Sequence, residues 1–344
     1  MRFFKKPFNK KAVTQEEEPL DSSTDISKQT NPSETGGQID NNTDNDFTML
    51  RDDGVRAMRM GQLVYAERCF SEALQKQDDN ITKSYLAEIY IDLHMEEKAL
   101  PLLDQLTEQH PDEIKLFLAK AQAAYQCSDW NALSIAADEI LRIDPQNSNG
   151  FFNKAQALFG IKDYLKAIVL LTQILVDKPE ATQPRMLRAK VLYEMQQYGE
   201  AEKDVDIIIG KEQASEDTFA LKGDICCALG NFDTAIAYYE KMKEIDPFNQ
   251  EAVLKIGKIH IDNHQLNKAL ALYDEAIELQ PNFAQAYKER GNIRLQLHDK
   301  LGATDDLKKA LELAPAEGRK VDGKYESVQN EMEARYKTQN PFGF

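Results

Sequence analysis

Apolar residues repeat along the chain with a period of about 34 residues from Phe47 to Pro315. Within each period they recur three and four residues apart in two stretches that a short polar turn separates, as in DTFALKGDICCALGN followed by DTAIAYYEKMKEIDP. This spacing is typical of amphipathic α-helices. The pattern therefore predicts an all-α body built from eight pairs of helices.

Small residues fix the register of this repeat. Glycine or alanine recurs inside the first helix of each pair, where a larger side chain would hold crossing helices apart. The series is Gly54, Ala87, Ala121, Ala155, Ala189, Gly223, Gly257 and Gly291, with one step of 33 residues and six of 34. A second series, mostly alanine, lies early in the second helix, and a proline closes most periods because it cannot continue a helix. One elongated body of stacked repeats is expected.

The spacing resembles that of the tetratricopeptide repeat (TPR) family, as in the seventh period with Gly257, Ala269, Ala276 and Pro281. The resemblance spans residues 47–315 and implies a right-handed superhelical solenoid of about eight helix–turn–helix repeats. The sequence departs from the family pattern at four positions, where looser packing or a different turn is expected: Leu106, Leu133, Ile140 and Gln213.

Both ends differ in composition from the repeats. Residues 1–46 are mostly polar, so they predict a disordered tail that cannot bury enough apolar surface to order itself. Their first twelve residues combine five cations with three phenylalanines. Three interpretations stay open for residues 1–12: a solvated tail, a weak contact with a membrane or acidic surface, and a targeting peptide.

The C-terminal end predicts one more helix. Between residues 316 and 338, Tyr325, Val328, Met332 and Tyr336 recur at three- and four-residue spacing. This pattern favours a helix that caps the open end of the solenoid, with a partner-binding helix as the alternative. Residues 339–344 are expected to form a loose tail.

Charge and motifs exclude several functions. The net charge of −16 argues against unspecific nucleic-acid binding. The sequence has no 18-residue apolar run, no secretory pattern and no C-x-x-C pair among its four cysteines, so a reducing, cytoplasmic location is expected.

His260 and His264 share the spacing of some metal ligands but lack a third ligand, so a turn histidine is favoured. Phosphate loops and nucleophile elbows are absent, so neither an enzyme nor a cofactor is predicted.

The TPR resemblance implies that five positions of each first helix face a concave groove. Three, four or seven residues separate these positions, so they lie on one helix face. The predicted groove residues are Leu118, Gln122, Tyr125, Asn149, Phe152, Gln156, Phe159, Met186, Lys190, Tyr193, Lys258, Lys288 and Asn292. Their aromatic rings fit either peptide contact or packing between helices, whereas their amides can pair with a peptide backbone.

These observations predict a scaffold or adaptor that binds an extended peptide or a partner helix in the groove. The alternative is a structural subunit or assembly factor of a larger secretion, membrane-associated or chaperone-linked complex. Some TPR co-chaperones hold a carboxylate with a clamp of basic and amide residues. Lys288 and Asn292 match only the first pair of that clamp and lie in the last repeat, so no carboxylate-clamp function is expected.

Overall fold

The computed structural model describes residues 41–314, which form sixteen α-helices joined by short turns. The helices are α1 Asn41–Arg59, α2 Leu63–Lys76, α3 Asn80–Asp92, α4 Glu96–Gln109, α5 Ile114–Gln126, α6 Trp130–Ile143, α7 Ser148–Gly160, α8 Tyr164–Asp177, α9 Thr182–Glu194, α10 Tyr198–Gly210, α11 Glu216–Ala228, α12 Phe232–Ile245, α13 Gln250–Asp262, α14 Leu266–Leu279, α15 Ala284–Gln296 and α16 Lys300–Leu313. Their order gives the eight predicted pairs, with odd-numbered helices first in each repeat.

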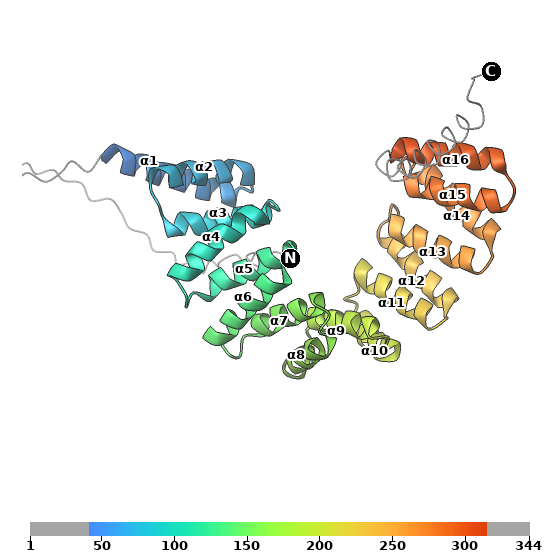
Figure 1. Cartoon of the computed structure of the whole chain (residues 1–344), viewed down its shortest axis with the longest axis horizontal. Coiled ribbons are helices and arrows are strands. Elements are labelled where there is room, and N and C mark those ends of the chain that lie inside the picture. Colours follow the sequence, from blue (N-terminus) through green and yellow to red (C-terminus); the bar gives the residue numbers. More distant parts are fainter. Residues whose placement is uncertain (1–40, 315–344) are drawn as a thin grey trace, which may run out of the picture.

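The pairs stack into an open arch with α7 to α10 at its apex (Figure 1). Each helix packs against the next along the chain, so hydrophobic clusters follow one another through the solenoid. Helix α1 begins at Asn41, inside the segment 1–46 that was expected to be a tail. Asparagine, threonine and aspartate are favoured at helix starts, and all three occur in residues 41–44. The basic start 1–12 and the expected capping helix 316–338 lie outside the described residues.

The size of each small residue is related to that of the residue sixteen positions later, which lies on the second helix of the same repeat. Where the first helix has Gly54, Gly223 or Gly257, the facing residue of the second helix is aromatic: Phe70, Tyr239 or Tyr273. A β-carbon added at Gly223 would lie 2.3 Å from the Tyr239 ring. Where the first helix has Ala155 or Ala189, the corresponding residues are Leu171 and Val205. These three glycines thus admit rings that an alanine would displace.

The turn within each repeat uses one left-handed residue. This position has positive φ in every described repeat: Gly61, His94, Ser128, Lys162, Gln196, Gly230, His264 and His298. The following amide donates to a carbonyl five residues back, as from Asp129 N to Ala124 O at 2.8 Å. This is the Schellman geometry that ends helices. His264 is thus an exposed turn residue, as the sequence indicated.

The four expected departures from the repeat pattern do not all behave alike. Looser packing at Leu106, Leu133 and Ile140 was wrong, because all three are fully buried. Gly150, on α7 of the next repeat, makes room for Ile140, since a β-carbon added at Gly150 would lie 2.9 Å from the Ile140 side chain. Gln213 does change the turn: α10 ends at Gly210 and Glu212 adopts positive φ.

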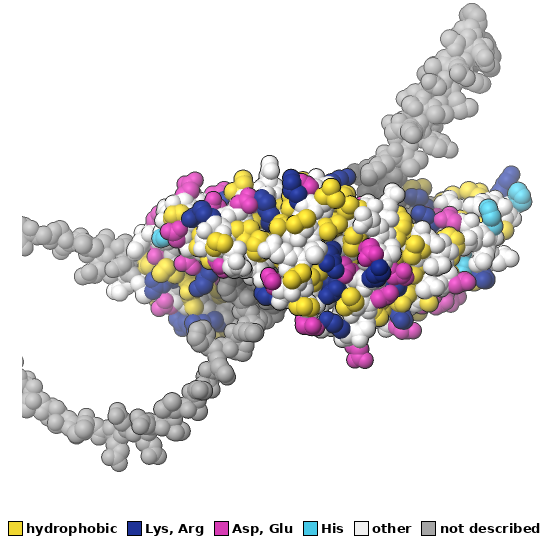
Figure 2. All heavy atoms as spheres, turned by 90° about the horizontal axis from the view of Figure 1, so that it is seen from below, with side chains coloured by type: hydrophobic (Ala, Val, Ile, Leu, Met, Phe, Trp, Pro, Cys, Tyr) yellow, Lys and Arg dark blue, Asp and Glu magenta, His cyan; other side chains and the backbone are white. Residues whose placement is uncertain are grey.

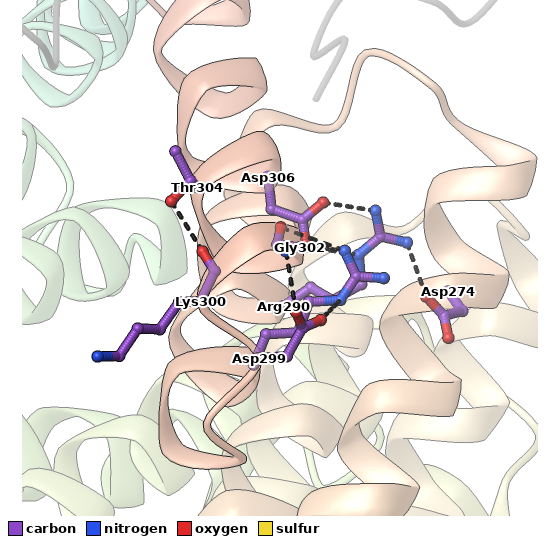
Figure 3. Close-up of polar contacts among 8 residues, drawn as sticks. Asp274, Arg290, Asp299, Lys300, Gly302, Thr304 and Asp306 are labelled. Atoms are coloured by element: carbon purple, nitrogen blue, oxygen red, sulfur yellow. Dashed lines mark hydrogen bonds and ion pairs between the residues drawn. The ribbon is translucent and has the colours of Figure 1, made fainter.

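Ion pairs tie successive repeats together at a recurring position. In four repeats a cation of the first helix reaches an acid sixteen residues earlier, in the second helix of the preceding repeat: Lys120–Asp104, Lys154–Asp138, Lys222–Asp206 and Arg290–Asp274. Figure 3 shows the last of these, in which Arg290 also binds the buried Asp306 at 2.7 Å. Asp306 accepts from Arg294 as well, at 2.9 Å. Buried charges are tolerated when paired in this way.

Candidate functional site

The first helices of the repeats form the inner side of the arch. From α1 to α11, each odd-numbered helix contacts the next odd-numbered helix as well as its own partner. Close approach of these helices, with the even-numbered helices farther out, curves the stack around them. The predicted groove residues all belong to α5, α7, α9, α13 and α15.

Three predicted aromatics lie near the C-terminal ends of α5, α7 and α9. Each pairs with a ring at the start of the following helix: Tyr125 with Trp130, Phe159 with Tyr164, and Tyr193 with Tyr198. The ring centroids are 6.0, 6.0 and 5.5 Å apart. Tyr125 keeps 46% of its surface exposed, and Phe159 and Tyr193 are half-buried. These rings thus pack within their repeat and also present an edge to solvent.

The remaining predicted residues of the middle repeats divide by exposure. Leu118, Phe152 and Met186 are half-buried against the cores of their repeats. Gln122 and Gln156 are half-buried, whereas Asn149 is exposed. The amides therefore reach the surface beside packed apolar side chains.

Polar contacts join the repeats from α9 to α13. Lys190 lies 3.8 Å from Asp217 in the next repeat. Farther along, Asp224 accepts a hydrogen bond from the Tyr239 hydroxyl at 2.7 Å and from Lys255 Nζ at 2.6 Å. Burial, reinforced by Asp224, raises the pKa of Tyr239 far above its usual value. The phenol therefore stays a donor at any physiological pH.

Between α13 and α15 the inner side is hollowed. The hollow has a volume of about 300 Å³ and is lined by Leu254, Lys258, Ile261, Tyr273, Gln285 and Glu289. Leu254 and Ile261 supply apolar wall, while the ammonium of Lys258 is exposed. Gln285 donates to Glu289 at 2.7 Å, so this amide is held in place. The arrangement suits one apolar side chain beside a group that pairs with a cation.

The sequence had identified only part of this hollow. Lys258 was predicted. Lys288 and Asn292 lie on α15, and Asn292 donates at 3.5 Å to Glu289, which lines the hollow. Leu254, Ile261 and Gln285 occupy the same repeat positions as predicted groove residues of other repeats, so the 34-residue register could have found them. Tyr273 could not be found this way, because it reaches the hollow from the second helix.

No metal-binding group occurs among residues 41–314: no cluster of three histidine, cysteine or acidic side chains is present there. His260 Nδ1 instead lies 2.9 Å from Gln265 Oε1. The same part of the chain also has no helix long and apolar enough to cross a membrane.

Two family models described as tetratricopeptide repeat match residues 186–250 and 228–293. No curated protein matches the sequence. Among solved structures, the chain is similar to a tetratricopeptide repeat protein from Parabacteroides merdae, with a TM-score of 0.60, 15% identity and coverage of 73% of this chain and 99% of the other. It is also similar to a chain of the APC/C hetero-tetramer Cut9–Hcn1, with a TM-score of 0.50, 12% identity and coverage of 74% and 50%.

At these identities the likeness to solved structures shows the fold alone. The family models add the repeat itself over residues 186–293. The chain is a tetratricopeptide repeat protein, a member of a family that serves in general as a scaffold for protein–protein interaction.

Proposed function

We propose that this protein is an adaptor that binds an extended peptide along the inner side of the arch, in a cytoplasmic setting. The observation that carries the proposal is the hollow between α13 and α15, because four of its six lining residues occupy predicted groove positions of two successive repeats. A pocket of about 300 Å³ is at the small end of ligand sites and fits a single large side chain.

The chemistry of the lining defines the expected peptide. Leu254 and Ile261 favour an aliphatic or aromatic anchor, since burying such a side chain contributes about 1.5–3 kcal/mol. The exposed ammonium of Lys258 favours a carboxylate close to this anchor. An acidic peptide with one large apolar residue is therefore the proposed ligand class.

The middle repeats extend the proposed contact. The half-buried amides of Gln122 and Gln156 can pair with a peptide backbone, and the ring edges of Phe159 and Tyr193 can line side-chain pockets beside them. Lys190 adds a cation, although Asp217 partly neutralises it at 3.8 Å. Anchoring is therefore expected mainly in the hollow, with weaker contacts from α5 to α9.

A peptide library displayed on phage and selected on the full chain tests the proposal. The selected peptides should share an apolar residue beside an acid, and fluorescence polarisation then measures their affinity. Lys258→Glu should weaken binding at least about tenfold through charge repulsion. The matched control is Lys268→Glu, an exposed lysine on the second helix α14 that should leave affinity unchanged.

A second variant tests the apolar contact. Ile261→Ser should also weaken binding, with far-UV circular dichroism showing that the helices are retained. Equal affinity of the wild type and both groove variants, or a loss in Lys268→Glu alone, would exclude this site.

A further inference from the structure

Three large apolar side chains are exposed along the outward side of α8. Leu165, Val169 and Val176 are exposed over 69%, 65% and 73% of their surface, and exposed Thr172 lies between them. Their spacing of four, three and four residues puts all four on one helix face. These residues are termed the α8 stripe. Figure 2 views the arch from below, the side on which α8 lies, and shows hydrophobic side chains gathered over the middle of this side.

The α8 stripe differs from the same positions on neighbouring second helices. At the position of Thr172, five of them carry an acid: Asp104, Asp138, Asp206, Glu240 and Asp274. Four of these acids hold the cation of the following repeat. Helix α8 therefore lacks the charge that the repeat elsewhere places on this surface.

Arg188 of the following repeat pairs with a buried acid, and position 172 carries no acid. Arg188 lies 3.3 Å from Thr172 Oγ1, but its guanidinium binds Asp204 at 2.7 Å, and Asp204 is only 3% exposed. In the last repeat, Arg290 has both an inner acid, Asp306, and an outer one, Asp274. A buried acid such as Asp306 or Asp204 is therefore compatible with a second acid at the exposed position that Thr172 occupies in α8. Helix packing alone does not explain why the α8 stripe is uncharged.

The geometry of the α8 stripe is self-complementary. Its four–three–four spacing is the same in both chain directions, so two antiparallel copies align residue for residue, with Leu165 against Val176 and Val169 against Thr172. Its ends carry opposite charges: Lys162 and Lys166 at the start, Asp177 and Glu180 beyond the end. An antiparallel pair brings each basic end to an acidic one. Lys166 and Glu180 already form surface pairs with Asp163 and Lys211, and exposed pairs of this kind exchange at little cost.

We propose that the α8 stripe is a homodimer interface, in which α8 of a second copy packs antiparallel against it about a two-fold axis. A two-fold contact uses the same patch on both subunits, as this pattern requires. The surface lies on a second helix, so it goes beyond the groove and leaves peptide binding independent of dimerisation. Two convex surfaces that meet along one helix each bury less than the roughly 800 Å² per partner of a standard interface. A reversible dimer with a dissociation constant in the micromolar range is expected.

Sedimentation velocity on the full chain over roughly a hundredfold range of concentration tests the proposal, in the range where weak interfaces dissociate. The wild type should shift from 39.1 kDa toward twice that mass. Val169→Glu should remain monomeric, because it buries a carboxylate against apolar side chains. Ala237→Glu is the matched control, since Ala237 is exposed at the same repeat position of α12, and it should dimerise like the wild type.

A charge exchange tests the antiparallel orientation. Lys166→Glu and Asp177→Lys should each weaken the dimer, and the double variant should restore it, because Lys166 of one copy faces Asp177 of the other. A wild type that stays monomeric throughout would overturn the proposal and leave the α8 stripe to a different protein. A dimer that survives Val169→Glu would place the interface elsewhere and would overturn it equally.

Discussion

Replacing Gly223 by alanine tests whether the glycines of the repeat are there to admit rings. The added β-carbon would lie 2.3, 2.6 and 2.8 Å from three carbons of the Tyr239 ring. The ring has little freedom to move, because it is 1% exposed and its hydroxyl donates to Asp224, which Lys255 also holds. The substitution must therefore displace either the ring or helix α11.

The magnitude follows from three contributions. Overpacking a core typically costs about 1–3 kcal/mol. If the ring moves, the hydrogen bond to the Asp224 carboxylate is lost as well, which adds about 1.5–3 kcal/mol. Alanine is favoured over glycine inside a helix by about 1 kcal/mol, which offsets part of the loss. When the ring moves, a net destabilisation of about 1.5–5 kcal/mol is expected for Gly223→Ala.

Urea unfolding followed by circular dichroism measures the change, and hydrogen exchange of α11 and α12 locates it, since solenoids can unfold repeat by repeat. The control is Gly199→Ala in α10, where an added β-carbon meets nothing within 4 Å, so stability should rise slightly. In a Tyr239→Leu background, which imitates the Ala155–Leu171 pair, Gly223→Ala should become neutral or stabilising. A wild-type or higher stability for the single variant Gly223→Ala would refute the reasoning.

Three further predictions concern the turns and the charges. Ser128→Gly should raise stability by about 1 kcal/mol in thermal unfolding, because Ser128 has φ 57° and glycine removes the left-handed strain; an unchanged midpoint would contradict it. Asp204→Asn should cost about 3 kcal/mol, because Arg185 and Arg188 lose their carboxylate, whereas exposed Asp262→Asn should change little; equal midpoints in urea would show that the buried pair is dispensable. Burial, with the charge of Asp92 adding to it, raises the pKa of Glu88 in the folded protein, so folding favours the protonated acid. The contribution of Glu88 to the free energy of unfolding therefore falls as the pH rises from its pKa in the unfolded chain toward its pKa in the folded protein. Glu88→Gln should therefore raise the melting temperature at pH 7.5 and have less effect at pH 4; an equal shift at both values would exclude this linkage.

The fold could be predicted from the sequence because the same contact between helices recurs in each repeat and leaves the same residue pattern. Gly223 and Gly257 in register with Ala155 and Ala189 show where first helices meet their partners, and that register also orients the groove positions. Helix periodicity assigns Phe159 and Tyr193 to one face of their helices, whereas the inward direction of that face was implied by the tetratricopeptide resemblance.

Only the tertiary structure decided how particular side chains are used. The hollow between α13 and α15 depends on how two repeats are spaced and on Tyr273 reaching across from α14. The pairing of Arg188 with Asp204 in place of an acid at position 172 depends on distances within a buried network, which residue spacing does not specify. Periodicity assigns a residue to a helix face, whereas packing between repeats determines whether that face is buried, hollowed or left open, because it depends on the volumes of side chains far apart in the sequence.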